Sequence, residues 1–226
     1  MERKYYEAYD DRYKQVHQES VLWFSESPSP IVTETITEFG IKHDSKLLEL
    51  GCGEGRDAIH LLNQGFDLLA TDVSPTAIEF CRNRFPHTAK RFDVLDCVNG
   101  QLNVTYDFIY AVAVIHMLVL QEDRDAFYQF IRNHLKDSGL ALICTMGDGS
   151  IERQSDIRTA FDLQQRLHEQ SGKMISIAST SCRMVSFETF DDELKRNGLT
   201  VVKKGLTSID PDFTQIMYAV VRKANY

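Results

Sequence analysis

The chain has 226 residues, a net charge of −8 at pH 7 and 43% hydrophobic residues, which indicates one folded domain with a real core. No apolar run approaches the roughly 20 residues of a membrane-spanning helix. The charged N-terminus also lacks the apolar segment of a secretory signal, so we expect a cytoplasmic protein. The negative balance disfavours a nucleic-acid partner, because such binders neutralise phosphate with basic surfaces. Five cysteines without a Cys-x-x-Cys pair predict reduced thiols and no metal site.

The first 30 residues are polar and rich in tyrosine, and the proline-containing ESPSP at 26–30 separates them from the body of the chain. The tyrosines recur at near-helical spacing, which fits either core packing or a lid whose aromatic faces contact a ligand. We expect residues 1–30 to form a helical lid or cap on a single domain spanning 1–226. Arg12 and Lys14 are candidates to meet a ligand carboxylate. The tyrosines of this leader are Tyr5, Tyr6, Tyr9 and Tyr13.

From residue 46 onward, short apolar runs alternate with segments of helical spacing, which predicts a parallel sheet with helices on both faces. Near the end, two strands are joined by the short link IDPDF. That link is too short for a crossover helix, so these strands should pair antiparallel. The predicted strands are 46–51, 66–72, 89–95, 106–115, 140–147, 199–208 and 215–223, and the predicted helices are 56–65, 76–85, 123–139 and 187–198.

Residues 148–186 form an insertion after the fifth predicted strand. The segment 151–172 has the pattern of a polar helix, and 174–186 looks strand-like. The insertion leaves the carboxyl edge of the sheet, where ligands bind in this class of fold. It is either a decoration or an element that covers the substrate, and a long connection in a compact domain favours the second.

The sequence GCGEG at 51–55 follows the first predicted strand, which carries Glu49. Glycines between a parallel strand and a helix let the backbone approach a ligand and present the free N–H groups of the helix. Dinucleotide sites have G-x-G-x-x-G, whereas this loop has G-x-G-x-G and an acid, Glu54, that would repel a pyrophosphate. The loop favours a ligand with an amino-acid end. Its N–H groups would bind the carboxylate, and Glu49 or a nearby carbonyl would bind the ammonium.

ELGCGEG at 49–55 closely resembles the first motif of class I S-adenosylmethionine-dependent methyltransferases, and LLATDVS at 68–74 resembles the second. RFDVLD and YDFIYAVAVIHML resemble the third and fourth motifs. The resemblance is strong over about residues 45–147. It implies an α/β, Rossmann-like fold with a seven-stranded, mostly parallel sheet, an antiparallel C-terminal strand and helices on both faces. It also implies S-adenosylmethionine as the cofactor and S-adenosylhomocysteine as the product.

The resemblance implies specific roles for the cofactor-binding residues. Asp72 would bind both ribose hydroxyls, which a carboxylate can accept in charge-assisted bonds. Asp93 would receive the adenine amino group, with Asp96 as the competing candidate. Ala111 and Val112 would pass near the methionine part. The implied cofactor-binding set is Glu49, Gly51, Cys52, Gly53, Gly55, Arg56, Asp72, Val73, Asp93, Val94, Ala111 and Val112.

His116 follows the fourth strand, at the edge where a methyl acceptor should lie. A histidine there is either a general base for an O–H or N–H nucleophile or a residue that only caps or packs. Arg183 would bind an anionic acceptor or form a surface salt bridge. The predicted catalytic residue is His116, and the predicted substrate residues are Tyr5, Tyr9, Tyr13, His116, Met117 and Arg183.

The leader, the Trp23-Phe24 step and GEGR at 53–56 are similar to the small-molecule branch that includes tellurite-resistance and thiopurine-type methyltransferases. The expected reaction is therefore methyl transfer to a sulfur, oxygen, nitrogen or chalcogen atom of a small molecule. Two alternatives stay open, a non-catalytic cofactor-binding sensor or partner subunit, and a nucleic-acid or protein methyltransferase. A metal-dependent catechol-type enzyme is disfavoured by alanines after strand four, and a dinucleotide oxidoreductase by the glycine spacing. The oligomeric state is left open.

Overall fold

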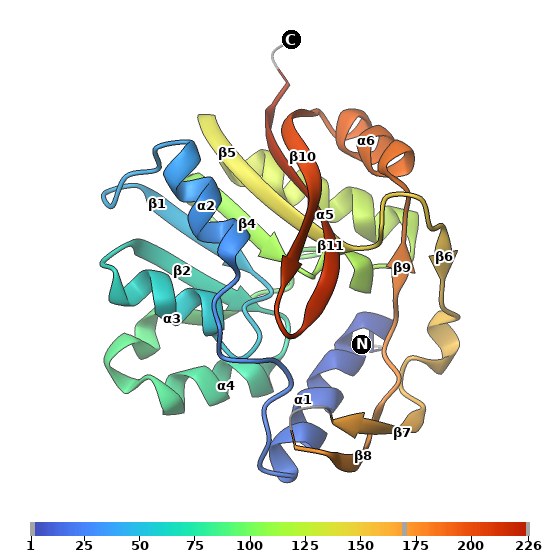
Figure 1. Ribbon diagram of the computed structural model, residues 1–226. Helices are drawn as coiled ribbons and strands as arrows, with labels where there is room; N and C mark the ends of the chain where they lie inside the picture. The colour runs from blue at the N-terminus through green and yellow to red at the C-terminus, as the bar shows by residue number, and fades with distance from the viewer. Residues whose placement is uncertain (1–2, 169–170, 225–226) are drawn as a thin grey trace.

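The computed structural model describes residues 3–168 and 171–224. Seven strands form its central sheet: β1 Lys46–Leu50, β2 Asp67–Asp72, β3 Phe92–Val94, β4 Tyr106–Val112, β5 Leu135–Met146, β10 Leu199–Ile209 and β11 Phe213–Lys223. Their order is β10-β11-β5-β4-β1-β2-β3 (Figure 1). Neighbours pair in parallel except at β11, which runs antiparallel to both β5 and β10. The predicted fold class is confirmed.

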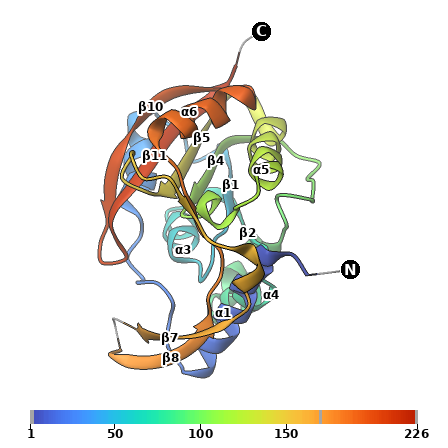
Figure 2. The same cartoon turned by 90° about the vertical axis from the view of Figure 1, so that its right-hand side faces the viewer.

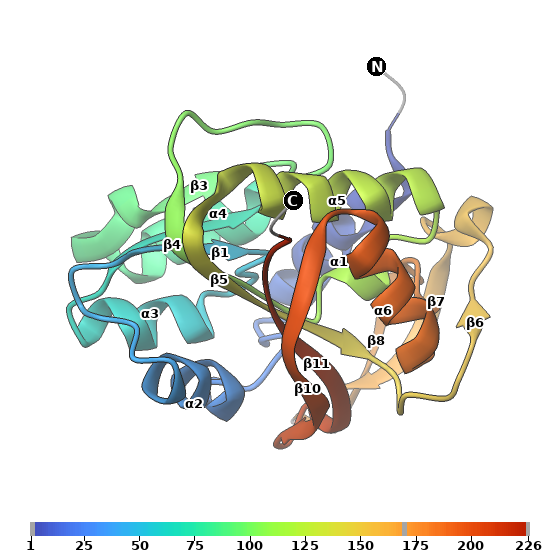
Figure 3. The ribbon, with the colours of Figure 1, turned by 90° about the horizontal axis from the view of Figure 1, so that it is seen from above.

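Helices cover both faces of the sheet, as Figure 3 shows from above. Consecutive residues of a strand point to opposite faces. Leu47 accordingly packs with α2, α3 and α4, whereas Leu48 packs with α5 and α6. Burial on both faces explains why β1 and β4 read as unbroken apolar runs in the sequence. The helices are α2 Pro30–Glu38, α3 Arg56–Asn63, α4 Pro75–Arg84, α5 Gln121–His134 and α6 Phe187–Arg196.

The strand order creates one topological switch point. The chain leaves β1 toward β2 on one side, while β4 pairs with the other side of β1. In open α/β sheets, the crevice outside the carboxyl ends of such strands is where ligands bind. The loops after β1, β2 and β4 therefore meet at one edge of the sheet.

The N-terminal leader lies across this carboxyl edge, below the sheet in Figure 1. It consists of a 3-10 turn, η1 Tyr5–Glu7, and the helix α1 Ala8–Gln18. Residues 21–29 then run without helix or strand to α2, and we call this segment the strap. Leader and strap together enclose the edge of the sheet from which the glycine loop projects.

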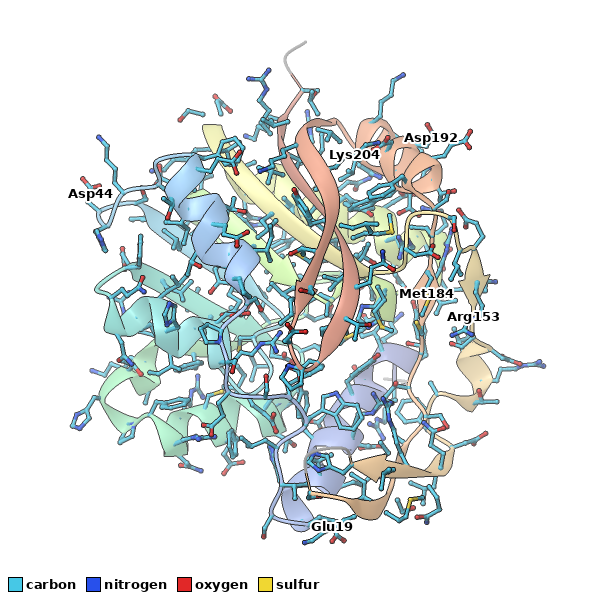
Figure 4. The ribbon with its side chains drawn as sticks, in the orientation of Figure 1. Glu19, Asp44, Arg153, Met184, Asp192 and Lys204 are labelled. Carbon is cyan, nitrogen blue, oxygen red and sulfur yellow. The ribbon has the colours of Figure 1, made fainter. Side chains whose placement is uncertain are left out.

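The insertion is built from strands, and the helix predicted for 151–172 is wrong. Its elements are β6 Arg153–Gln154, η4 Ile157–Thr159, β7 Leu163–His168, β8 Lys173–Ala178 and β9 Arg183–Met184. β7 and β8 form an antiparallel hairpin beside α1 (Figure 2). β6 pairs with β9, with Arg153 opposite Met184 on the outer side of the molecule (Figure 4).

Packing against α1 explains why this segment forms a hairpin and not the predicted helix. Ile175 and Ile177 alternate along β8 and are buried against Val16 of α1. On the opposite face of the hairpin, Leu167 and Met174 are 53% and 60% exposed. Packing against a distant helix thus favours a strand, in which every second residue is buried. The sequence of the hairpin alone does not show that this helix is nearby.

The remaining elements occur where they were predicted, with shifts of a few residues at their ends. The largest shift concerns the helix predicted at 123–139, which ends at His134 and passes directly into β5. The His134 ring lies 2.8 Å from the carbonyl of Phe130 and 3.0 Å from the Leu102 backbone N–H. No helix within 3–168 or 171–224 is both long and apolar enough to cross a membrane.

Candidate functional site

A pocket opens at the switch point, below the carboxyl ends of β1, β2 and β4. It encloses about 1290 Å³, part of it open to solvent. Small-molecule sites typically enclose roughly 300–1,000 Å³. The pocket is lined by eleven of the predicted residues: Glu49, Gly51, Cys52, Gly53, Arg56, Asp72, Val73, Val112, Tyr9, Tyr13 and Met117.

The glycine loop has the shape of a cradle that only glycine can form. Gly51 and Gly53 have φ angles of +72° and +53°, in the left-handed region that side chains disfavour. A Cβ on Gly51 would lie 2.4 Å from Cγ2 of Val114, and one on Gly53 would lie 2.6 Å from the hydroxyl of Tyr13. Since neither glycine leaves space for a side chain, the backbone of the loop itself forms this part of the pocket wall.

Asp72 ends β2 on the same wall of the pocket. Its carboxylate accepts hydrogen bonds from the backbone N–H groups of Gly53, at 2.8 Å, and Ser74, at 2.9 Å. Burial raises the pKa of Asp72 to about 6, against the effect of these N–H donors. The carboxylate thus joins the glycine loop to the start of α4, and it lines the pocket where a sugar hydroxyl could reach it.

Glu49 lies in β1, just before the glycine loop, and also lines the pocket. Its Oε2 accepts a hydrogen bond from the Tyr110 hydroxyl at 3.0 Å. Burial, with Asp57 nearby, raises the pKa of Glu49 well above its ordinary value. A cation placed beside this carboxylate would restore its charge, which matches the predicted partnership with an ammonium group.

The structure corrects the predicted adenine contacts. Asp93 is an exposed residue, with its side chain 66% accessible and paired with Arg82, and Val94 is exposed next to it. Neither residue lines the pocket. The next turn of chain does, through Asp96, Cys97 and Val98, so Asp96 is the one of the two candidate acids that lines the pocket. β3 ends at Val94, and the chain reaches the pocket only after it leaves the sheet.

Two further predicted cofactor residues belong to the interior. Gly55 is packed against Cys81, Phe85 and Phe92 and begins α3 without lining the pocket. Ala111 points into the core on the side of α5. The pocket wall after β4 is formed instead by Val112, Ala113 and Val114. Ala113 has a φ angle of +57°, a strained conformation for a residue with a side chain, of the kind that clusters at functional sites.

His116, predicted to lie against a methyl acceptor, does not line the pocket. Its side chain is buried, and Nδ1 has no hydrogen-bond partner. Burial, with help from Arg124 and Arg12, lowers the pKa of His116 to about 3. Such an imidazole stays neutral at pH 7 and accepts a proton poorly, so the general-base role loses its structural support. The neighbouring Met117 does reach the pocket.

The leader tyrosines divide between the two readings of their pattern. Tyr6, Tyr9 and Tyr13 line the pocket, as a lid would. Tyr5 is a structural residue, because its hydroxyl accepts from the backbone N–H groups of Val119 and Leu120. The same helix face therefore serves the core at one end and the pocket at the other.

Arg183 and Arg12 bind the protein itself, and neither lines the pocket. Arg183 donates from Nη1 to the carbonyl of Val119 at 3.0 Å and lies 3.7 Å from Glu193. Arg12 is buried and donates to the carbonyls of Ala178 and Ser179 in the insertion, at 2.9 and 2.8 Å. The anion-binding role of Arg183 and the carboxylate contact of Arg12 are thus not supported.

Sequence reasoning missed the part of the pocket that the strap supplies. Leu22, Phe24, Ser25 and Glu26 line it, although they carry no motif. The Trp23-Phe24 step was the one available signal in this segment, and only for family resemblance. Among the described residues, no three His, Cys, Asp or Glu side chains gather as a metal site, and all five cysteines are free.

Comparisons with known proteins agree with this geometry. Residues 48–141 match the family model described as a methyltransferase domain. The chain is 34% identical over 109 residues to hemagglutinin 1 of Eikenella corrodens, a match that covers 46% of this chain and 35% of that protein. It is 31% identical over 122 residues to the ubiquinone biosynthesis O-methyltransferase of Rickettsia akari, covering 51% and 46%. The chain thus spans between about a third and a half of these curated relatives.

The fold is shared with solved methyltransferase structures. One is the 1,6-didemethyltoxoflavin-N1-methyltransferase of Burkholderia thailandensis, whose structure holds 1,6-didemethyltoxoflavin and S-adenosylhomocysteine. The TM-score is 0.69 at 16% identity, over 100% of this chain and 92% of that chain. Residues 48–141 therefore match a methyltransferase domain, and the sheet order and the glycine loop beside Asp72 fit the fold that these solved methyltransferases share.

Proposed function

We propose that the protein transfers the methyl group of S-adenosylmethionine to a small-molecule acceptor. One observation carries this proposal, the convergence of the glycine cradle and Asp72 on one pocket, joined by the 2.8 Å bond from Gly53 N–H to Asp72. When bound, the cofactor supplies a methyl group already activated by a positively charged sulfur. The work left to the protein is to bind, to orient and to exclude water.

Each wall of the pocket has a part in this proposal. Asp72, fixed by the Gly53 N–H, would hold the ribose hydroxyls, Glu49 the ammonium group and the loop N–H of Gly51 the carboxylate. Asp96, with Cys97 and Val98, takes over the adenine role first assigned to Asp93. Apolar residues beside Met117, among them Val114 and Leu118, line the pocket there and would exclude water from the reacting atoms.

The small-molecule acceptor is proposed from the enclosure of the pocket and from the names of the relatives. Leader and strap line the pocket, which suits a compact acceptor better than a polymer. The relatives act, by name, in ubiquinone biosynthesis and on a didemethyltoxoflavin. We also propose that the protein belongs to a small-molecule branch similar to the tellurite-resistance and thiopurine-type enzymes.

Calorimetric titration with S-adenosylhomocysteine and S-adenosylmethionine tests the cofactor. We expect wild-type protein to bind at micromolar or tighter concentrations and Asp72→Ala to lose the binding. Asp67→Ala is the matched control, because Asp67 lies at the opposite end of the same strand and pairs on the surface with Arg91. Absence of binding by the wild type would refute the proposal.

Methyl transfer itself is tested with radiolabelled cofactor and a panel of thiols, phenols, amines and reduced chalcogens. Cofactor binding without transfer to any acceptor would favour the sensor or partner-subunit alternative. Transfer to nucleic acid or to a protein would replace the small-molecule part of the proposal. Both outcomes leave the cofactor site in place, so the two halves of the proposal are tested separately.

A further inference from the structure

The strap is held by hydrogen bonds to carboxylates from other parts of the chain. Three consecutive residues, Trp23, Phe24 and Ser25, donate their backbone N–H groups to Glu54 and Asp212. An irregular segment usually finds partners in its own turns or in water. Here its backbone donors are bound by two charged groups, and hydrogen bonds to charged acceptors are stronger than neutral ones.

Glu54 holds the first half of the strap. It lies inside the glycine loop, between Gly53 and Gly55, and is buried. Its carboxylate accepts from the backbone N–H of Trp23 at 2.9 Å and of Phe24 at 3.2 Å, and its Oε1 lies 2.9 Å from Nε2 of His17. One side chain of the loop therefore ties both α1 and the strap to the cradle.

Asp212 holds the second half from the link between β10 and β11. It accepts from the backbone N–H and the hydroxyl of Ser25, at 3.0 and 2.7 Å, and it pairs with Arg56 of α3. Phe213 packs against Phe24 with ring centroids 5.7 Å apart. The strap is thus fastened at two points that are far apart in the sequence.

The fastened residues form a wall of the pocket. Leu22, Phe24 and Ser25 line it, and so does Glu54. The carbonyl of Leu22 lies 2.6 Å from Nε2 of His168 in the hairpin, which supports the strap from outside. The strap therefore bounds the pocket on this side.

We propose that Glu54 is a positioning residue that couples the glycine loop to closure of the strap and thereby sets how long the cofactor is retained. This inference rests on the proposed function for the identity of the ligand. It also explains why an acid stands in a loop that receives a carboxylate. The charge of Glu54 is directed away to the strap, where N–H groups and His17 compensate it.

The dissociation rate of S-adenosylhomocysteine tests the proposal. It is measured in a stopped-flow instrument by displacing the bound ligand with excess sinefungin. We expect Glu54→Gln to raise the dissociation rate at least about tenfold, because the amide keeps the shape but loses the charged acceptor. Asp212→Asn should raise it as well, although Asp212 does not line the pocket. Glu38→Gln, which removes an exposed pair with Lys203, is the control and should leave the rate unchanged.

The double variant separates positioning from direct contact. If both carboxylates act by holding the strap, Glu54→Gln combined with Asp212→Asn should raise the rate by less than the product of the two single effects. Fully multiplicative effects, or a dissociation rate within twofold of wild type in Glu54→Gln, would overturn the coupling. Either result leaves the proposed function standing as long as wild-type protein binds S-adenosylhomocysteine.

Amide hydrogen exchange of the ligand-free protein gives a test that needs no ligand. Glu54→Gln should speed exchange at Trp23 and Phe24 at least tenfold and leave the strands β1 and β4 protected. Unchanged exchange at these two amides would overturn the proposal whatever the protein binds. Should Glu54→Gln fail to fold, Asp212→Asn must show faster exchange at Ser25 together with faster dissociation.

Discussion

Asp72 links the chemistry of the pocket to pH. Its ordinary pKa of 3.8 is raised by burial to about 6, so the ligand-free protein holds an extra proton on this carboxyl between these values. Folding stability gains from this group at low pH, and the gain is lost as pH rises through the window. The affinity for ribose hydroxyls should instead rise with pH, since the ionised carboxylate binds them and Asp72 must first lose its proton.

We therefore expect the affinity for S-adenosylhomocysteine to fall below pH 6, by up to about tenfold per pH unit. Calorimetry between pH 4.5 and 8 measures it. Asp72→Asn should bind more weakly at every pH and lose this dependence, whereas the surface variant Asp67→Asn should keep it. An affinity that is flat across this range in the wild type would contradict the role of Asp72.

His116 predicts a change in stability. Its Nδ1 is buried without a partner, and such a group costs roughly 1–3 kcal/mol. His116→Leu should therefore raise the free energy of unfolding by about 1–2 kcal/mol at pH 7, measured by urea denaturation. The gain should be larger at pH 5, because the unfolded histidine takes up a proton that the folded one, with its pKa of about 3, refuses. A loss of stability would mean that the ring has an unseen partner.

The positions of residues were predictable where the backbone of a loop or the end of a strand determines them. The glycines and Asp72 fall at positions that the strand-loop-helix pattern alone determines. Asp93 and Asp96 are three residues apart, and only the place where β3 ends decides which reaches the pocket. His116 was misplaced for a similar reason, because η3 Ile115–Met117 turns its ring inward and Met117 outward.

At the scale of elements, α5 and α6 are joined by a wholly buried ion pair. Arg124 binds Glu193 through two bonds of 2.8 and 2.6 Å, and its Nη1 donates to the carbonyl of Ile115 at 2.8 Å. Tyr128 donates to the same Glu193. The pair thus fixes the segment that presents Met117 to the pocket.

Removing one partner leaves an uncompensated buried charge, so Arg124→Met should cost about 3–5 kcal/mol of stability. Replacing both, with Arg124→Met and Glu193→Leu, should recover most of the loss, since apolar pairs of similar volume are often as stable. Urea denaturation of the four proteins in the cycle gives the coupling. A double variant as unstable as the single one would show that the backbone bond to Ile115 dominates.

Elements with a local cause were predictable, and the insertion was not. Unbroken apolar runs in the sequence predict the parallel strands. Ser74 and Pro75 predict the start of α4, where the serine hydroxyl accepts a hydrogen bond from the backbone N–H of Ala77. The hairpin β7–β8 has no such local cause. Its period depends on α1, more than 140 residues earlier in the chain, and no property of residues 151–172 encodes that contact.

At the scale of the molecule, the pocket carries an excess of acidic groups. Its two arginines are already paired, Arg56 with Asp212 and Arg84 with Glu26, so within residues 3–168 and 171–224 the lining offers no free cation to an acceptor. Anionic acceptors should therefore be disfavoured, and uncharged ones preferred. The acidic side chains of the lining are Glu26, Glu49, Glu54, Asp57, Asp72 and Asp96.

A matched pair of acceptors tests this charge preference. We expect phenol, which is uncharged at pH 7, to be methylated with a kcat/KM at least about tenfold above that of a phenol carrying a ring carboxylate, a difference of about 1.4 kcal/mol. The difference in kcat/KM between the two acceptors should decrease only slightly at high salt, because salt screens buried charges poorly. A preference for the carboxylate would point to a cation in the acceptor path.

The position of β11 has a consequence for biosynthesis. This strand lies between β5 and β10, and it follows Asp212 directly. On the ribosome, the strap, the glycine loop and Asp72 emerge long before the group that fastens the far end of the strap. A nascent chain that already contains every predicted cofactor-binding residue therefore still lacks Asp212, which fastens the strap, and the strand β11, which pairs with β5. Synthesis of residues 212–223 supplies both in one step, so the protein acquires its sheet and its grip on a ligand together.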